Sequence, residues 1–272
     1  MPSPKKKYKR ITTNSLLEMK KNKEKIAMLT AYDFTLAKLV DASGVDIILV
    51  GDSASNVMAG HETTLPITLD QMIYHASSVI RGVDRALVVV DLPFGTYQSN
   101  SKIALESAIK IMKQSGAHSV KLEGGSEVRE SMERIIQAGI PVMGHLGLTP
   151  QSIYKFGTYS VRAKNEDEAN KIIDDAKMLE KIGCFGIVLE KIPALLSKKI
   201  AEIVKIPVIG IGAGKDVDGQ VLVLHDMLGM TQDFSPRFLR RYLDLKSEII
   251  NAIRSYTSDV KLLKFPSDSE QY

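Results

Sequence analysis

Four carboxylate side chains stand where short apolar runs of the chain end. These side chains, at or just after the ends of four separate β-branched runs, are Asp52, Asp91, Glu123 and Glu190. Taken singly, each could cap a helix or form a surface ion pair. If the runs are parallel strands of one sheet, the carboxylates meet at one edge, and without a cation they would repel one another and raise each other's pKa. Oxygen ligands without the Cys and His spacing of a zinc site favour a hard ion such as Mg²⁺.

Two further polar residues belong to the same set. Lys121 precedes Glu123 by two positions, and residues two apart in a strand point to the same side. A lysine among carboxylates indicates an anionic substrate, and an ion pair between Lys121 and Glu123 is the alternative. His145 follows the segment "PVMG" at the end of another apolar run. It is either a site residue or a core histidine that is hydrogen-bonded to the backbone.

The elements that must position these residues alternate along the chain. Strands are predicted at 26–30, 46–50, 86–91, 119–123, 141–145, 185–189, 207–211 and 220–224. Helices are predicted between them at 34–42, 69–81, 101–114, 127–138, 166–181 and 194–204, and a last helix at 237–255 is expected to close the ring. Glycine or proline often marks the return from helix to strand, as in "GIP" before residue 142.

This alternation predicts an α/β fold, a single-domain (β/α)₈ TIM barrel. Segments such as "ALVVVD" and "FGIVLE" are almost continuously apolar, which is typical of strands covered on both faces. The 272 residues are close to the ~250 of one such barrel, whose active site forms at the carboxyl ends of the strands. The segment "GIGAG" lacks the spacing and position of a dinucleotide-binding motif. The link between the last two strands is short.

Composition sets the remaining expectations. We expect a basic tail at 1–13, the barrel at 14–256 and a second tail at 257–272. Five basic residues lie within the first ten positions and read as a solvated tail, or as a contact for phosphate or an acidic partner. The net charge of +4 is too small to indicate nucleic-acid binding, and no apolar stretch suggests a signal or a membrane span. The single cysteine, Cys184, is expected in the core of a cytoplasmic protein.

The chain resembles the ketopantoate hydroxymethyltransferase family over about residues 14–256. The resemblance is carried, in the family's order, by "LTAYD", "LVGDS", "TLPITLDQMIYH", "DLPFGTYQ", "VKLEGG", "GHLGLTPQS", "IPVIGIGAG" and "DGQVLVLHDMLGM". The segments "VKLEGG" and "GHLGLTPQS" are the most specific. The sequence departs from the family pattern after "GDS", in "FGTYSVRAK" and in the lysine that follows Glu190, where contacts to folate and the closing of a loop are expected.

The resemblance implies an enzyme that converts 3-methyl-2-oxobutanoate and 5,10-methylenetetrahydrofolate to 2-dehydropantoate and tetrahydrofolate, in the biosynthesis of pantothenate and coenzyme A. It also implies a homo-oligomer, usually a decamer. The roles it implies are Mg²⁺ ligation by Asp52, Asp91 and Glu123, oxo-acid binding by Asp52, Ser53, Asp91 and Lys121, and proton abstraction by Glu190.

Two alternatives stay open from the sequence. One is another Mg²⁺-dependent barrel enzyme that works through an enolate, of the isocitrate lyase or phosphoenolpyruvate mutase type. Those enzymes usually carry a cysteine in a "KKCGH"-like loop, which Cys184 lacks. The other is a binding scaffold with a basic tail, which would leave the carboxylates at the strand ends unexplained.

Overall fold

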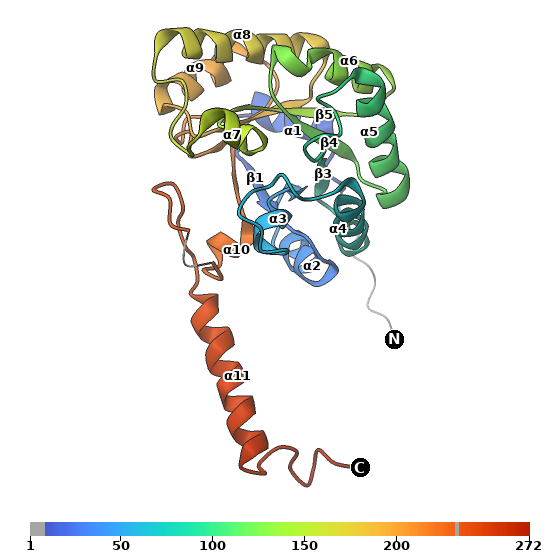
Figure 1. The fold of residues 1–272 in the computed structure, drawn as a ribbon, viewed down its shortest axis with the longest axis vertical. Helices are drawn as coiled ribbons and strands as arrows, with labels where there is room; N and C mark the ends of the chain where they lie inside the picture. The colour runs from blue at the N-terminus through green and yellow to red at the C-terminus, as the bar shows by residue number, and fades with distance from the viewer. Residues whose placement is uncertain (1–8, 232–233) are drawn as a thin grey trace. The chain divides into compact units, whose positions relative to one another are not determined.

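The computed structural model describes residues 9–231 and 234–272. Eight parallel strands pair in chain order and close into a barrel (Figure 1). They are β1 (Ile26–Thr30), β2 (Ile47–Val50), β3 (Leu87–Asp91), β4 (Ser119–Glu123), β5 (Val142–Gly147), β6 (Gly186–Glu190), β7 (Val208–Ile211) and β8 (Gly219–Leu222). The predicted TIM barrel is confirmed.

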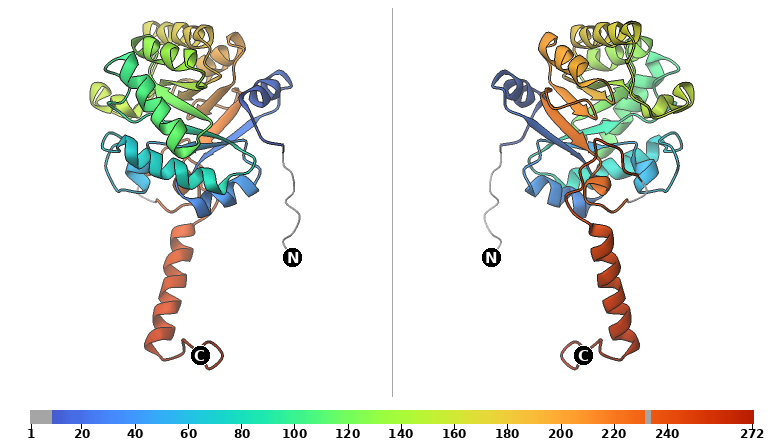
Figure 2. Two further views of the ribbon diagram at one scale, coloured as in Figure 1. Left: turned by 90° about the vertical axis from the view of Figure 1, so that its right-hand side faces the viewer. Right: turned by 90° about the vertical axis from the view of Figure 1, so that its left-hand side faces the viewer.

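Six helices cover the barrel on its outside (Figure 2). They are α2 (Phe34–Ala42), α4 (Leu69–Gly82), α5 (Ser101–Ser115), α6 (Arg129–Gln137), α8 (Glu166–Ile182) and α9 (Ala194–Ile203). The predicted helices coincide with them to within two residues at each end. Side-chain caps fix their first turns, as where Thr68 and Gln71 form a capping box at the start of α4. The α8 helix stops at Gly183, whose φ of 100° suits a residue without a Cβ.

Short turns of helix follow several strands and carry the connecting loops over the end of the barrel. They are α3 (Ala54–Val57), the 3₁₀ turns η1 (Ser126–Val128) and η2 (Pro150–Ser152), and α7 (Ile153–Phe156). The predicted eighth strand is wrong in its last two residues, since β8 ends at Leu222 and Leu224 begins the short helix α10 (Leu224–Met227). The link from β7 to β8 contains no helix, in agreement with its predicted shortness.

A helix that the sequence did not predict precedes the barrel. The α1 helix (Thr13–Lys21) begins inside the segment expected to be a tail, with Thr12 as its capping residue. Its Leu16 is fully buried in the core cluster inside the barrel, together with Ile26 and Ile47 at the amino-terminal ends of their strands. Lys20 donates to two backbone carbonyls and pairs with Asp218 at 2.7 Å. The helix therefore closes the amino-terminal end of the barrel. The first eight residues of the predicted tail lie outside the described residues.

The residues from Leu224 to Tyr272 form a separate compact unit. Its main element is α11 (Leu245–Lys261), in which no described residue is buried. The predicted start of this helix at residue 237 is wrong, because Asp244 caps it by accepting from the Ser247 amide. Its role in closing the ring of helices and the three-part division of the chain stay predictions. Within the described part of the chain, no helix has the length and apolarity needed to span a membrane.

Along single strands, the residues that point into the barrel change from apolar core residues to polar residues of the site. The core cluster contains Leu87 and Val89, and the next inward position of that strand is Asp91. In the same way Met143 is followed two residues later by His145. The period of two that fills the barrel with apolar side chains thus also points the polar residues inward at the carboxyl ends of the strands.

Candidate active site

The structure brings the predicted site residues together at the carboxyl end of the barrel. Strand register sets Asp91 beside Lys121 and Glu123 beside His145. Glu190 ends β6 next to Gly147 of β5. Five of the side chains are between 2% and 5% exposed, namely Asp52, Asp91, Lys121, Glu123 and His145. Such burial of charged groups requires that they pair with one another or with a ligand.

Two aspartates form one side of the site. The backbone amide of Asp52 donates to Asp91 Oδ2 at 3.0 Å, and Lys121 Nζ lies 2.9 Å from Asp91 Oδ1. Burial, followed by the charges of Asp91 and Glu123, raises the pKa of Asp52 well above its usual value. Burial also raises the pKa of Asp91, although the Lys121 ammonium opposes this rise. The pair therefore needs additional positive charge to stay fully ionised.

His145 joins two carboxylates on the other side. Its Nδ1 lies 3.4 Å from Glu123 Oε1 and 3.2 Å from Lys121 Nζ, and its Nε2 lies 3.4 Å from Glu190 Oε2. Burial and the nearby ammonium disfavour an imidazolium, but the two carboxylates outweigh them and raise the pKa of His145 to about 9. The partners of this ring are side chains of the site. The interpretation of His145 as a core histidine bonded to backbone is therefore wrong.

Glu123 has both carboxylate oxygens engaged. Oε1 faces His145, and Oε2 accepts from the backbone amide of Gln151 at 2.9 Å. Burial would raise the pKa of this carboxyl, but His145, Lys121 and the Gln151 amide lower it below its usual value. Glu123 is therefore an ionised partner of these groups.

Ser53 is held from the first strand-to-helix loop. Tyr32 lies just after β1, and its hydroxyl lies 2.8 Å from Ser53 Oγ. The backbone carbonyl of Tyr32 lies 2.8 Å from His75 Nδ1 of α4. Ser53 is half-buried next to Asp52 at the start of α3, which leaves its hydroxyl at the rim of the site.

The segment "FGTYSVRAK", one of the departures from the family pattern, forms a loop beside Glu190. Arg162 donates from its backbone amide to the carbonyl of Lys191 at 2.8 Å, and its guanidinium lies over the ring of Phe156 at 4.1 Å. Lys191 Nζ donates to the backbone carbonyl of Tyr159, and burial and the charge of Glu190 raise the pKa of the Tyr159 phenol. The loop is thus tied to the carboxyl end of β6 despite its departure from the family pattern.

Two residues of the site were not predicted from the sequence. Gln151 and Tyr97 are 6% and 1% exposed, and their side chains share a hydrogen bond of 2.7 Å. Both lie in segments that carry the family resemblance, "GHLGLTPQS" and "DLPFGTYQ", but nothing in the local pattern assigns them a role. Each lies in the loop that follows a strand with a site residue at or near its carboxyl end, and this position is the sequence feature that could have indicated them.

The charges of the site fit a divalent cation. Four carboxylates converge, whereas the positive side chains among them are Lys121 and His145. In the described residues no group of three or more His, Cys, Asp and Glu side chains is arranged to hold a metal ion by itself, and the ligand set of Asp52, Asp91 and Glu123 stays a prediction. Mg²⁺ in proteins is commonly held by one or two carboxylates, with substrate and water as its other ligands. Asp52 and Asp91 match this requirement.

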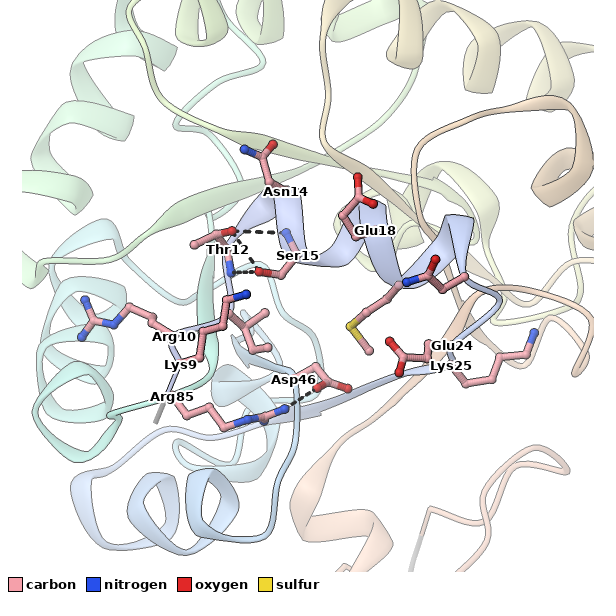
Figure 3. A pocket seen from close by; sticks show the side chains of 13 residues that line it. Lys9, Arg10, Thr12, Asn14, Ser15, Glu18, Glu24, Lys25, Asp46 and Arg85 are labelled. Atoms are coloured by element: carbon pink, nitrogen blue, oxygen red, sulfur yellow. Dashed lines mark hydrogen bonds and ion pairs between the residues drawn. The ribbon is translucent and has the colours of Figure 1, made fainter. Parts of the chain in front are cut away.

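The opposite end of the barrel carries a hollow of about 850 Å³ beside α1 (Figure 3). Arg85 and Asp46 in its wall pair with each other at 2.8 Å, and Thr12 and Ser15 form the capping box of α1. Lys9 and Arg10 are exposed at its rim. The Arg85–Asp46 and Thr12–Ser15 pairs satisfy each other's polar groups, and the converging buried carboxylates all lie at the other end of the barrel.

Comparison with known proteins gives close relatives along the whole chain. The 3-methyl-2-oxobutanoate hydroxymethyltransferase of Flavobacterium johnsoniae is 74% identical over 272 residues, covering 100% of both chains. The protein of that name from Christiangramia forsetii is 72% identical, again over 100% of both chains.

Solved structures with the same fold are much more distant in sequence. A phosphonopyruvate hydrolase in complex with oxalate and Mg²⁺ is 10% identical, with a TM-score of 0.60, and covers 96% of this chain and 93% of its own. A 2,3-dimethylmalate lyase is 13% identical, with a TM-score of 0.59, and covers 96% and 91%. The sequence profile of the ketopantoate hydroxymethyltransferase family matches residues 10–268. Together with the close relatives, this match shows that the chain belongs to the ketopantoate hydroxymethyltransferase family.

Proposed function

We propose that this chain transfers a hydroxymethyl group from 5,10-methylenetetrahydrofolate to 3-methyl-2-oxobutanoate, giving 2-dehydropantoate and tetrahydrofolate. The observation that carries the proposal is the buried array at the carboxyl end of the barrel. In it, Asp52 and Asp91 lie next to Lys121, and Glu190 lies beside a cationic His145. Membership of the family and the names of the close relatives support the same reaction.

Asp52 and Asp91 would hold Mg²⁺ in this reaction. When bound, the ion would polarise the keto group of the oxo acid and stabilise the negative charge that develops on its oxygen. The raised pKa values of both aspartates support the assignment, because burial and the neighbouring carboxylates disfavour two anions that no cation neutralises. Glu123, the predicted third ligand, contacts His145 and Gln151. We assign it the role of keeping these two neighbours in place.

Lys121 and Ser53 would bind the oxo acid. Burial alone would lower the pKa of Lys121, but Asp91, Glu123 and Asp52 raise it well above its usual value. The side chain therefore stays an ammonium and can attract the substrate carboxylate. Ser53 can donate a hydrogen bond from the rim of the site. Two fixed contacts orient the substrate, so that its C3 hydrogen points in one direction.

Glu190 would remove the C3 proton of the oxo acid. Its side chain is 15% exposed, which is more open than the other carboxylates of the site, and the His145 ring stands behind it at 3.4 Å. A carboxylate in this position accepts the proton while the electron pair moves into the enolate.

The second step forms the new carbon–carbon bond. Water adds to the methylene carbon of the folate as its bond to one folate nitrogen breaks, and the bond to the second nitrogen then breaks, so that both nitrogens gain a proton, tetrahydrofolate leaves and the carbon remains as formaldehyde. The C3 carbon of the enolate attacks this carbonyl carbon, the keto group of the oxo acid is restored, and the new alkoxide takes a proton to become the hydroxymethyl group. No protein nucleophile takes part, which agrees with a site built from carboxylates, a lysine and a histidine.

The isocitrate lyase type of reaction is less well supported. Enzymes of that type usually use a reactive cysteine. Cys184 is 2% exposed, and burial raises the pKa of its thiol to about 12. A thiol in this state is neither ionised nor accessible at neutral pH. The binding-scaffold alternative leaves the buried array without a purpose.

The proposal is tested by turnover of the purified chain with Mg²⁺ and both substrates, followed by mass spectrometry of 2-dehydropantoate. We expect product from the wild-type chain and from Glu202→Gln, an exposed glutamate of α9 that serves as a matched control. We expect a loss of at least ~10²-fold for Glu190→Gln. Product formation by the wild type and Glu190→Gln at equal rates would refute the assigned base.

The wider setting follows from the same reaction. We propose that the product feeds pantothenate and coenzyme A synthesis in the cytoplasm, and that the chain assembles as a homo-oligomer, in the family's usual form a decamer. Its partners would be the small oxo acid and folate, with no nucleic acid or membrane. Analytical ultracentrifugation of the purified protein tests the assembly, and a monomer at micromolar concentration would contradict it.

A further inference from the structure

Gln151 occupies a central place among the buried carboxylates. It lies in η2, directly after β5, and is 6% exposed. Its side-chain Nε2 donates to Asp52 Oδ2 at 2.8 Å and to the backbone carbonyl of Leu92 at 3.0 Å. Its backbone amide donates to Glu123 Oε2 at 2.9 Å. One residue thus reaches a carboxylate that follows β2 and another that ends β4.

The orientation of this side chain is fixed from the other end. Gln151 Oε1 accepts from the Tyr97 hydroxyl at 2.7 Å and from Gln98 Nε2 at 3.0 Å. With Oε1 held by two donors, the amide group cannot rotate by half a turn, and its NH₂ group must face Asp52. Tyr97 is itself fixed, because its hydroxyl also accepts from the backbone amide of Glu123 at 3.1 Å.

We infer that Gln151 is a positioning residue, which holds Asp52 Oδ2 and so directs the other oxygen of that carboxylate toward the metal position. The inference rests on the proposed function, in which Asp52 and Asp91 hold Mg²⁺. Within the described residues, no hydrogen bond to Asp52 Oδ1 is found.

The role is specific to a donor at this position. Methionine has nearly the length and shape of glutamine but no hydrogen-bonding amide. In Gln151→Met the backbone amide would still serve Glu123, whereas Asp52 would lose its anchor. The Asp52 carboxylate could then rotate, and binding of a cation would have to offset the entropy that is lost when this rotation stops. Loss of such an outer partner of a ligand typically weakens metal binding by about 10–100-fold.

The test measures Mn²⁺ affinity by electron paramagnetic resonance of the free ion, without substrate, in the full chain. We expect Gln151→Met to bind Mn²⁺ about 10–100-fold more weakly than the wild type. The matched control is Gln137→Met, the same substitution at an exposed glutamine of α6 that lies outside this network, and its Mn²⁺ affinity should stay within about twofold of the wild type. Thermal unfolding of each variant reports whether the fold is kept. A purely structural role would lower the unfolding temperature but leave the affinity of the folded protein unchanged.

Tyr97→Phe keeps the test decisive if Gln151→Met does not fold. It removes the hydroxyl that fixes Gln151 Oε1, and it should weaken Mn²⁺ binding by about two- to tenfold, the worth of one hydrogen bond. The inference is overturned if Gln151→Met binds Mn²⁺ with the affinity of the wild type. If only Tyr97→Phe folds, wild-type Mn²⁺ affinity in that variant overturns it. A wild-type chain that binds no Mn²⁺ also overturns it. A wild-type chain that binds Mn²⁺ but makes no product refutes the proposed function alone, since the affinities still decide the role of Gln151.

Discussion

Replacing His145 by glutamine removes a positive charge from between two carboxylates, and its effect on stability can be calculated from the structure. The pKa of His145 is raised from 6.5 to about 9 by its hydrogen bonds to Glu123 and Glu190, which outweigh burial and Lys121. A difference of about 2.5 pKa units, at about 1.4 kcal/mol each, corresponds to about 3–4 kcal/mol of folding free energy. The side chain is buried, so solvent screening reduces this value little.

The sign of the pH dependence follows from the direction of the shift. Because the folded pKa is raised, the contribution is fully present below pH ~6.5 and is lost as the pH rises through about 9. The metal-free wild-type protein should therefore lose about 3 kcal/mol of stability between pH 6 and pH 9.5 that His145→Gln does not lose. Urea unfolding in EDTA, followed by circular dichroism at one protein concentration, measures the difference.

His118 provides the matched control. Burial and the charge of Arg10 lower the pKa of His118, so this ring is neutral in the folded protein above pH 7. His118→Gln removes the acceptor for the Val88 amide and should cost a constant amount of stability from pH 7 to pH 9.5. Stability curves of wild type and His145→Gln that run parallel over this range would refute the reasoning about His145.

Three other substitutions test the metal site, the packing of α1 and the buried cysteine one at a time. Asp91→Asn should keep the fold but weaken Mg²⁺ binding, measured by calorimetry. The loss should exceed the ~10–100-fold that follows from removing a residue that only hydrogen-bonds to a metal ligand. Unchanged Mg²⁺ affinity would show that Asp91 is not a ligand. Leu16→Ala should cost about 2–5 kcal/mol in urea unfolding, because it opens a cavity under α1, while metal affinity stays at the wild-type value. Cys184→Ala should leave turnover within about twofold of the wild type, since the thiol is buried and not ionised, and a larger loss at unchanged stability would revive a cysteine mechanism.

Much of the barrel was predictable because strand patterns are local. Apolar runs ending in a polar residue at the inward position, such as Val89 followed by Asp91, predict both the strand and the direction of the carboxylate. The rule that active sites form at the carboxyl ends of barrel strands then brings distant residues together. This reasoning needs only the order of the elements, and the closed sheet follows that order.

The missed features depend on contacts that local patterns do not contain. The α1 helix is mainly polar and buries a single residue, Leu16, so its periodicity is weak. Gln151 acquires its role only when the loop after β5 meets the loop after β2. His145 could not be assigned from sequence, because the same apolar run fits a core histidine and a histidine between two carboxylates.

The central claim is that Glu190 takes the C3 proton of the oxo acid, and hydrogen exchange tests it most directly. The wild-type chain with Mg²⁺ and 3-methyl-2-oxobutanoate in D₂O, without folate, should exchange the C3 hydrogen, as followed by proton NMR. Glu190→Gln keeps the shape of the side chain but cannot accept the proton. It should exchange about 10²–10⁴-fold more slowly, with unchanged oxo-acid affinity in calorimetry. Exchange at the wild-type rate in Glu190→Gln would contradict the account.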